Sequence, residues 1–188
     1  MTTHAEPETT GVDEAGIATR LARLESVEQI RQLVARYGFA VDDRDVAAVK
    51  RLFAADGSLR TAAGTGKGQG VDAVGEYFVG RFQVLGPTYH YTHDHVIDFD
   101  PDDPHLARGR VAGHAEVWRD GAPMLTAIRY LDTYVQRDGV WLFLERVQAY
   151  MYFADVRDYP EVLGHDLRVR LGPAESDWKP ADWPVITR

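Results

Sequence analysis

Two short stretches of this chain carry side chains that can move protons, a carboxylate in residues 37–45 and an imidazole in residues 89–95. Histidine has the unperturbed pKa nearest neutrality, and a carboxylate on its far ring nitrogen fixes the tautomer and raises the basicity. If Asp42 and His90 meet in a pocket, they form a general acid/base pair. We expect them within hydrogen-bond reach at the floor of the largest pocket.

Both residues also have ordinary structural explanations. An aspartate after a helix is commonly a turn former, and a histidine in a strand is commonly a hydrogen-bonded core or surface residue. Asp43 directly follows Asp42, and either carboxylate could cap a turn. Strand alternation places His90 on one face of its strand and the close pair His93 and His95 on the other.

Cofactor sites are not indicated. His93 and His95 are a tempting metal motif, but a third ligand is missing, since His105 lies in an acidic turn. The glycine run at 64–70 resembles a phosphate loop only superficially, because Lys67 is followed by glycine rather than Ser or Thr. We expect a mobile turn there, and an activity that needs neither metal nor nucleotide.

The carboxylate follows a helical pattern. Apolar residues recur at steps of three and four from Ile17 to Tyr37, as in an amphipathic helix. Residues 26–29 fit a capping box, so this segment is one helix or two. Asp45 can cap a short helix over 46–53, which stops at Asp56-Gly57.

The imidazole opens a series of strands. A short strand at 58–63 and a helix at 71–85 come first, and then the periodicity changes to two. Asp-Gly pairs at 120–121 and 138–139 are strong hairpin signals. The four long strands expected are 88–99, 107–119, 124–137 and 140–153. Helices followed by an antiparallel meander predict an α+β fold, a strongly curved, mostly antiparallel sheet packed against N-terminal helices.

The chain divides into three predicted parts: a disordered N-terminus (1–12), one domain (13–153) and an irregular C-terminal tail (154–188). Trp178 and Trp183 in the tail could cover the pocket mouth or pack on a neighbouring subunit. The 188 residues carry a net charge of −8 and no cysteine. This charge disfavours nucleic acid and anionic membranes as partners. The N-terminus lacks the apolar core of a signal peptide, which predicts a cytoplasmic protein.

Four motifs in order resemble the SnoaL-like branch of the nuclear-transport-factor-like superfamily. They are residues 24–45, 52–57, 88–97 and 137–143. The resemblance implies a cone, in which a bent sheet and helices enclose one deep, mostly apolar pocket. It also implies association as homo-oligomers, dimers or trimers, through the sheet. Such cones host dehydratases, isomerases, cyclases, dehydrohalogenases and proteins that only bind a ligand.

Within the branch, the sequence is most similar to scytalone dehydratase and bile-acid dehydratase. The resemblance implies that Asp42 and His90 are catalytic, and the bile-acid enzyme adds a tyrosine at Tyr37. A second histidine of scytalone dehydratase corresponds to His114, which strand alternation alone leaves open between pocket and exterior.

Two positions depart from these enzymes and leave the substrate open. Thr61 stands where both have a strand tyrosine, and Tyr150 stands where the bile-acid enzyme has an arginine. Tyr150 continues a polar and aromatic strand face that suits a pocket wall, where it could donate to a substrate oxygen. We take His114, Tyr150 and Thr61 as substrate-binding candidates.

The sequence therefore predicts a cofactor-independent lyase, a dehydratase acting on a hydrophobic, oxygenated, cyclic small molecule through Asp42 and His90. An isomerase or cyclase would use the same groups, and a noncatalytic binding protein is the rival class. If His90 points inward, Tyr89, Tyr91, Ile97 and Phe99 lie on the outer face. That face predicts a homo-oligomer, unless the tail folds back over it.

Overall fold

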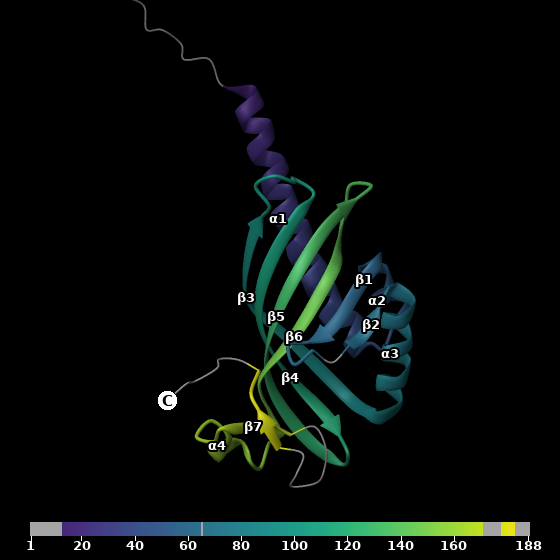
Figure 1. The fold of residues 1–188 in the computed structure, drawn as a ribbon, viewed down its shortest axis with the longest axis vertical. Helices are drawn as coiled ribbons and strands as arrows, with labels where there is room; N and C mark the ends of the chain where they lie inside the picture. Colours follow the sequence, from purple (N-terminus) through teal and green to yellow (C-terminus); the bar gives the residue numbers. More distant parts are fainter. Residues whose placement is uncertain (1–12, 65, 171–177, 183–188) are drawn as a thin grey trace, which may run out of the picture.

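The first helix, α1 (Glu14–Asp42), is continuous over 29 residues, so the alternative of two helices is wrong. Its buried residues lie between Ile30 and Val41, where it packs against the sheet. The computed structural model describes residues 13–64, 66–170 and 178–182. Figure 1 shows the first turns of α1 projecting beyond the sheet, where Ile17, Leu21 and Leu24 are 49%, 54% and 65% exposed.

Two shorter helices follow. α2 (Val46–Arg51) begins after Asp45, whose carboxylate accepts a hydrogen bond from the backbone N–H of Ala48 at 2.8 Å, as predicted. An aspartate here satisfies a donor that has no partner inside the helix. α3 (Val71–Val84) ends one residue before the predicted end.

The glycine run forms a short strand rather than a mobile turn. β2 (Gly66–Gln69) pairs antiparallel with β1 (Phe53–Thr61), which begins earlier than predicted and runs through Asp56 and Gly57. A Cβ atom on Gly68 would lie 2.5 Å from the backbone nitrogen of Val74. Glycine at this position therefore lets β2 pack directly against the first turn of α3.

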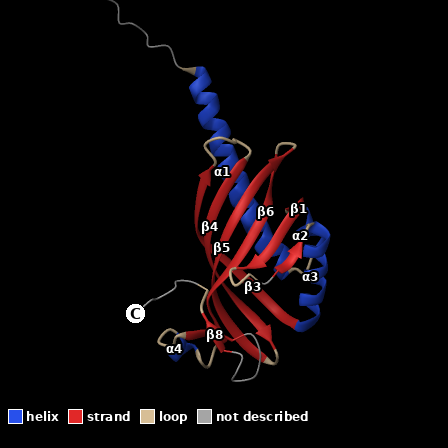
Figure 2. Ribbon diagram, in the orientation of Figure 1, coloured by secondary structure: helices blue, strands red, loops and turns tan. Residues whose placement is uncertain are grey.

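The sheet is curved and unclosed, and α1 lies against one face of it (Figures 1 and 2). Its long strands run antiparallel to one another, while β1 pairs parallel with β6. Asp120-Gly121 and Asp138-Gly139 form the predicted hairpin turns, with positive φ at all four residues. The long strands are β3 (Leu85–Phe99), β4 (Leu106–Arg119), β5 (Ala122–Arg137) and β6 (Val140–Asp155).

The tail has more regular structure than the sequence indicated. A short helix, α4 (Tyr159–Val162), leads to β7 (Leu167–Arg170), which pairs parallel with β6, and β8 (Trp178–Pro180) pairs with β7. Asp182 follows, and its N–H donates to the backbone oxygen of Tyr150 at 2.8 Å. The tail therefore extends the sheet. Residues 1–12 and Trp183 lie outside the described residues.

A β-bulge in β3 changes which side chains face inward. Thr92 pairs with Gly113 and His95 pairs with Val111, so β3 has one residue more than β4 between these points. His95, Ile97 and Phe99 consequently turn to the inner face, where Ile97 and Phe99 pack against the core. The prediction that these three face outward is wrong, because simple alternation ignores the extra residue. Tyr89 and Tyr91, before the bulge, are exposed as predicted.

The core lies between α1 and the inner face of the sheet. Tyr37 is at its centre, with four aromatic rings packed around its own, those of Phe53, Phe78, Tyr130 and Phe143. These rings occupy much of the space inside the cone. Within the described ranges, no helix is both long enough and apolar enough to cross a bilayer.

Candidate active site

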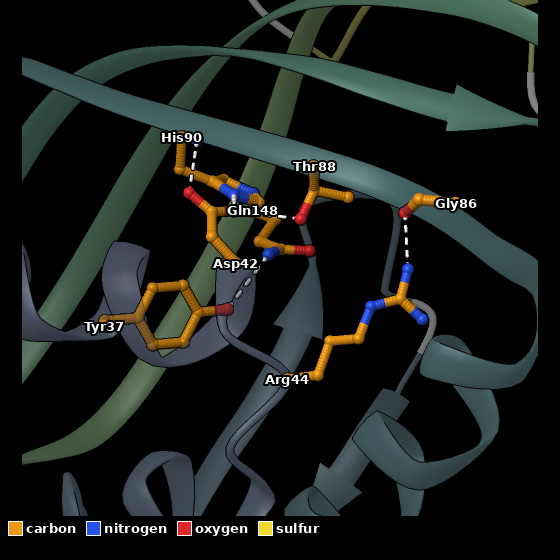
Figure 3. Close-up of polar contacts among 7 residues, drawn as sticks. All are labelled: Tyr37, Asp42, Arg44, Gly86, Thr88, His90 and Gln148. Carbon is orange, nitrogen blue, oxygen red and sulfur yellow. Dashed lines mark hydrogen bonds and ion pairs between the residues drawn. The ribbon is translucent and has the colours of Figure 1, made fainter.

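Asp42 and His90 meet at the end of α1. The Nδ1 atom of His90 lies 2.5 Å from Oδ1 of Asp42, and the His90 backbone N–H donates to Oδ2 at 2.7 Å. The hydroxyl of Thr88, two residues earlier on the same face of β3, donates to Oδ1 at 2.9 Å. Figure 3 shows the carboxylate held between these two residues of β3. The predicted pair is thus within direct hydrogen-bond reach.

The electrostatics keep Asp42 ionised. Partial burial alone would raise the pKa of its carboxyl, but the hydrogen bonds from His90 and Thr88 lower that pKa below its usual value. An ionised Asp42 accepts the Nδ1 proton of a neutral His90. The lone pair of the imidazole then sits on Nε2, where a general base needs it.

Arg44 fixes the distance between helix and strand. It has a positive φ of 59°, and its guanidinium donates to the carbonyl oxygens of Phe82, Leu85 and Gly86 at 2.7–2.8 Å. These carbonyls lie at the end of α3 and the start of β3, and Figure 3 shows the bond to Gly86. Because Arg44 follows α1 by two residues, it ties Asp42 to the strand that carries His90.

The cavity next to the pair is small. It measures about 60 Å³ and is lined by His90, Thr88 and side chains from α1, α3, β4, β5 and β6. Larger hollows of about 720 and 760 Å³ lie elsewhere, beside α2 and on the outer face. The prediction that the pair occupies the largest pocket is wrong, because aromatic rings fill the inside of the cone.

Tyr37 contributes its hydroxyl to this cavity. Its side chain is 3% exposed, and the oxygen accepts a hydrogen bond from Nε2 of Gln148 at 3.4 Å. Burial raises its pKa well above the usual value, so the phenol stays protonated and can donate. Tyr37 and Gln148 therefore stand beside the Asp42–His90 pair (Figure 3).

A second hollow adjoins the first, and we call it the outer chamber. Its volume is about 540 Å³, and it is lined by β1, β2, α3 and the tail residues Lys179 to Asp182. Lys67, Tyr77, Arg81 and Tyr150 line both hollows. Thr61 lines the outer chamber only, and so lies farther from the pair than Tyr150. Residues 179–182 of the tail thus line the outer chamber, whereas Trp178, one of the two tryptophans predicted to cover the pocket mouth, is not among its lining residues.

His114 is not brought to this pocket. On β4 it alternates with the buried residues Ala115 and Gly113 and faces outward. There its Nδ1 lies 2.8 Å from Nε2 of His93, and its ring stacks on Tyr91. The pocket around Asp42 and His90 is therefore formed without His114.

A second carboxylate–cation pair lies deeper in the cone. Arg146 and Asp132 have side chains with 0% exposure, and the guanidinium donates twice to the carboxylate, each time at 3.0 Å. Tyr134 donates to the same carboxylate at 2.9 Å, and His95 contacts the Tyr134 hydroxyl at 3.1 Å. The Arg146 guanidinium also lies 4.0–4.3 Å from three aromatic ring centroids, those of Tyr37, Tyr130 and Phe143.

Three further residues of the site differ in how well the sequence alone could have predicted them. Thr88 shares the face of His90 two residues away, so alternation would have found it. Gln148 belongs to the polar face that singled out Tyr150. Lys67 had no such signal, because a lysine within a glycine run is typical of an exposed loop.

The site contains proton-transfer and hydrogen-bonding groups. Across the described ranges, no cluster of three histidine, aspartate or glutamate side chains could hold a metal ion. An oriented imidazole can remove a proton, and a neutral phenol and an ammonium group can stabilise negative charge on oxygen.

A family profile described as SnoaL-like domain matches residues 22–147. No curated protein matches the chain. A Novosphingobium aromaticivorans DSM 12444 protein, provisionally named scytalone dehydratase, is 22% identical with a TM-score of 0.66, over 82% of this chain and 98% of that one. A type 2 LinA hexachlorocyclohexane dehydrochlorinase is 22% identical with a TM-score of 0.67, over 73% and 93%. At these identities the likeness shows the fold, an NTF2-like cone.

Proposed function

The chain belongs to the family of SnoaL-like domains, as its motifs predicted, and we propose that it is a cofactor-independent lyase of the dehydratase type. Its substrate would be a hydrophobic, oxygenated, cyclic small molecule. The observation that carries this proposal is the direct contact between Asp42 and Nδ1 of His90, which leaves Nε2 to act as a base. We place this activity in the cytoplasm, as the sequence predicts.

The reaction would proceed by removal of a proton next to a carbonyl. The C–H electron pair forms the new double bond, and the hydroxyl on the neighbouring carbon leaves. His90 takes the proton at Nε2 and returns it to the leaving hydroxyl, which departs as water. Asp42 stabilises the imidazolium in between, and Tyr37 and Tyr150 donate hydrogen bonds to the carbonyl or leaving oxygen. Few competing waters fit the small inner cavity, which strengthens these interactions.

Two alternatives use the same site. An isomerase or cyclase would move the proton without losing water. A noncatalytic binding protein would retain the fold and need no base. The hydrogen bonds to the carboxylate of Asp42 favour an enzyme, because a simple binding pocket gains nothing from an oriented imidazole.

Replacement of the pair tests the proposal. Cyclic β-hydroxy ketones are incubated with the protein, and the absorbance of the conjugated enone reports elimination. His90→Ala and Asp42→Asn should lower turnover by about 10²- to 10⁴-fold, the usual contribution of a positioned base. His93→Ala, on the outer face of the same strand, should leave turnover unchanged. Near-wild-type rates in the first two variants would show that the pair is structural.

We further propose that copies of the chain associate through the outer face of the sheet. Tyr89 and Trp118 there are 54% and 47% exposed, beside a surface hollow of about 760 Å³. Apolar patches of this kind usually mark an interaction surface. The rival is that the tail covers the face. Its residues 179–182 line the outer chamber, and Val156 is the one described tail residue that lines the hollow on the outer face.

Light scattering decides between the two. A dimeric or trimeric mass is expected for the full-length chain and for a chain that ends at Asp155. A monomeric mass for the full-length chain at micromolar concentration would refute assembly.

A further inference from the structure

Lys67 places an ammonium group between the two hollows without a carboxylate partner. Its Nζ contacts Oε1 of Gln148 and lies 3.5 Å from the hydroxyl of Tyr150. It also lies 5.3 Å and 5.6 Å from the ring centroids of Tyr77 and Tyr150. Among the described residues, no carboxylate comes within ion-pair distance of it. The cation is thus solvated by neutral oxygens and aromatic faces only.

Arg81 places a second cation at the junction, by which we mean the place where the inner cavity and the outer chamber meet. Like Lys67 it lines both hollows, and within the described ranges its guanidinium has no hydrogen-bond or ion-pair partner. Among the described residues of the outer chamber, Asp182 is the sole carboxylate, and its Oδ2 accepts from the backbone N–H of Tyr150 at 3.0 Å. The same lining also includes Arg119, which pairs with Asp120 at 3.2 Å, and Lys179, so the chamber has four cationic side chains against one carboxylate. Of these four, Lys67 and Arg81 line both hollows.

This local excess is unusual in a chain whose net charge is −8. Removing a cation from water is unfavourable unless an opposite charge or hydrogen bonds replace the water. Burial accordingly lowers the pKa of Lys67. A bound anion would offset this cost, because the cations that line the outer chamber outnumber its one carboxylate.

We propose that Lys67 and Arg81 bind a carboxylate group of the substrate at the junction of the two hollows, an inference that rests on the proposed function. The planar guanidinium suits a carboxylate, with which it forms paired hydrogen bonds. The inner cavity, about 60 Å³, admits only the reacting part of a molecule, while the outer chamber, about 540 Å³, is large enough for its body. The substrate class is thus a cyclic, oxygenated carboxylic acid.

Calorimetric titration tests this assignment without a known substrate. The probes are 2-naphthoate and 2-naphthamide, which share a ring system and differ in charge. Wild-type protein should bind the carboxylate roughly tenfold more tightly, the usual effect of a charged hydrogen bond. Lys67→Met and Arg81→Met should each lose that preference and keep their affinity for the amide. Lys67→Arg, which keeps the charge, should retain the preference.

The matched control is Lys50→Met, which removes a lysine charge from an exposed pair with Asp72. It should leave both affinities unchanged. Equal wild-type affinities for the two probes, or no binding of naphthoate at about 1 mM, would overturn the assignment. So would an unchanged preference in Arg81→Met, which decides the matter if Lys67→Met does not fold.

Failure of this assignment is distinguishable from failure of the proposed function. His90→Ala should keep the preference for the carboxylate, because it alters neither cation. If His90→Ala retains turnover while the preference is present, the proposed mechanism fails and the anion site stands. If turnover depends on His90 and the two probes bind equally, the mechanism stands and the anion site fails.

Discussion

The cone contains two carboxylate–cation pairs that differ chiefly in their surroundings. His90 lines the inner cavity and Asp42 contacts His90 from the end of α1, and each side chain is 18% exposed. Asp132 and Arg146 lie beside the aromatic rings of the core, and each side chain is 0% exposed. The first carboxylate accepts from groups on one strand, β3, whereas the second joins β5 to β6. The accessible pair can reach a substrate, and the buried pair can only hold the sheet together.

Their pKa values shift in opposite directions for this reason. Burial raises the pKa of Asp132, although Arg146 opposes the shift. Burial also acts on Asp42, but its hydrogen bonds outweigh it and lower the pKa. Two ion pairs in one core thus serve different purposes, because partial access to solvent decides whether hydrogen bonds or desolvation dominate.

The largest expected effect is on the buried pair. Arg146→Met leaves the charge of Asp132 buried without its partner, which typically costs about 3–5 kcal/mol of unfolding free energy. Urea denaturation measures this loss. The exposed pair gives the control, since Lys50→Met should cost no more than about 1 kcal/mol. The double variant Arg146→Met/Asp132→Leu should recover part of the loss, and a double variant as unstable as Arg146→Met would contradict this interpretation.

A smaller effect is expected at the accessible pair. Thr88→Val removes one hydrogen bond from Asp42, worth about 0.5–1.5 kcal/mol, and so should lower kcat/KM by up to about tenfold. Enone formation by wild type and variant measures this. Thr92→Val, on an exposed part of the same strand, should leave the rate unaltered. A rate for Thr88→Val equal to wild type would mean that Thr88 does not hold the carboxylate.

The smallest expected effect is a change in folding stability at acid pH. Because the folded-state pKa of Asp42 is lowered, its ionised form stabilises the fold fully above the unfolded value of about 3.9. That contribution disappears as the pH falls through the lower, folded-state pKa. Urea denaturation between pH 6 and pH 2, taken at roughly unit intervals, should show a shallower loss for Asp42→Asn than for wild type. Parallel curves would contradict the lowered pKa.

Local sequence patterns predicted much of the fold and part of the site. The Asp-Gly turns and the Asp45 cap follow from residue type and spacing, whereas the choice of Asp42 rather than Asp43 to meet His90 rested on the resemblance to the SnoaL-like family. The Asp132–Arg146 pair did not follow, because its partners are set by the register of β5 on β6. Arg129 is nearer to Asp132 in the sequence, but it is three residues away on the same strand and therefore on the opposite face.

The anion site was missed for a related reason. Lys67 acquires its place only when β2 pairs with β1 and packs on α3, contacts that come from distant parts of the chain. The residues around a glycine run show no hydrophobic periodicity, so the sequence does not indicate where Lys67 lies. The size of the inner cavity was also beyond the sequence, since it depends on how five aromatic rings pack around one another.

The bulge in β3 affects which deletions of a single codon the fold would tolerate. Deleting the single codon for Asp94 would remove the bulge but leave Thr92 opposite Gly113 and His95 opposite Val111, so the side chains from His95 to Phe99 would keep their present faces. His95 would stay beside Tyr134. A deletion elsewhere in a strand moves a row of side chains to the other face. Selection should therefore tolerate the loss of one residue between Thr92 and His95 more readily than a loss elsewhere in this strand.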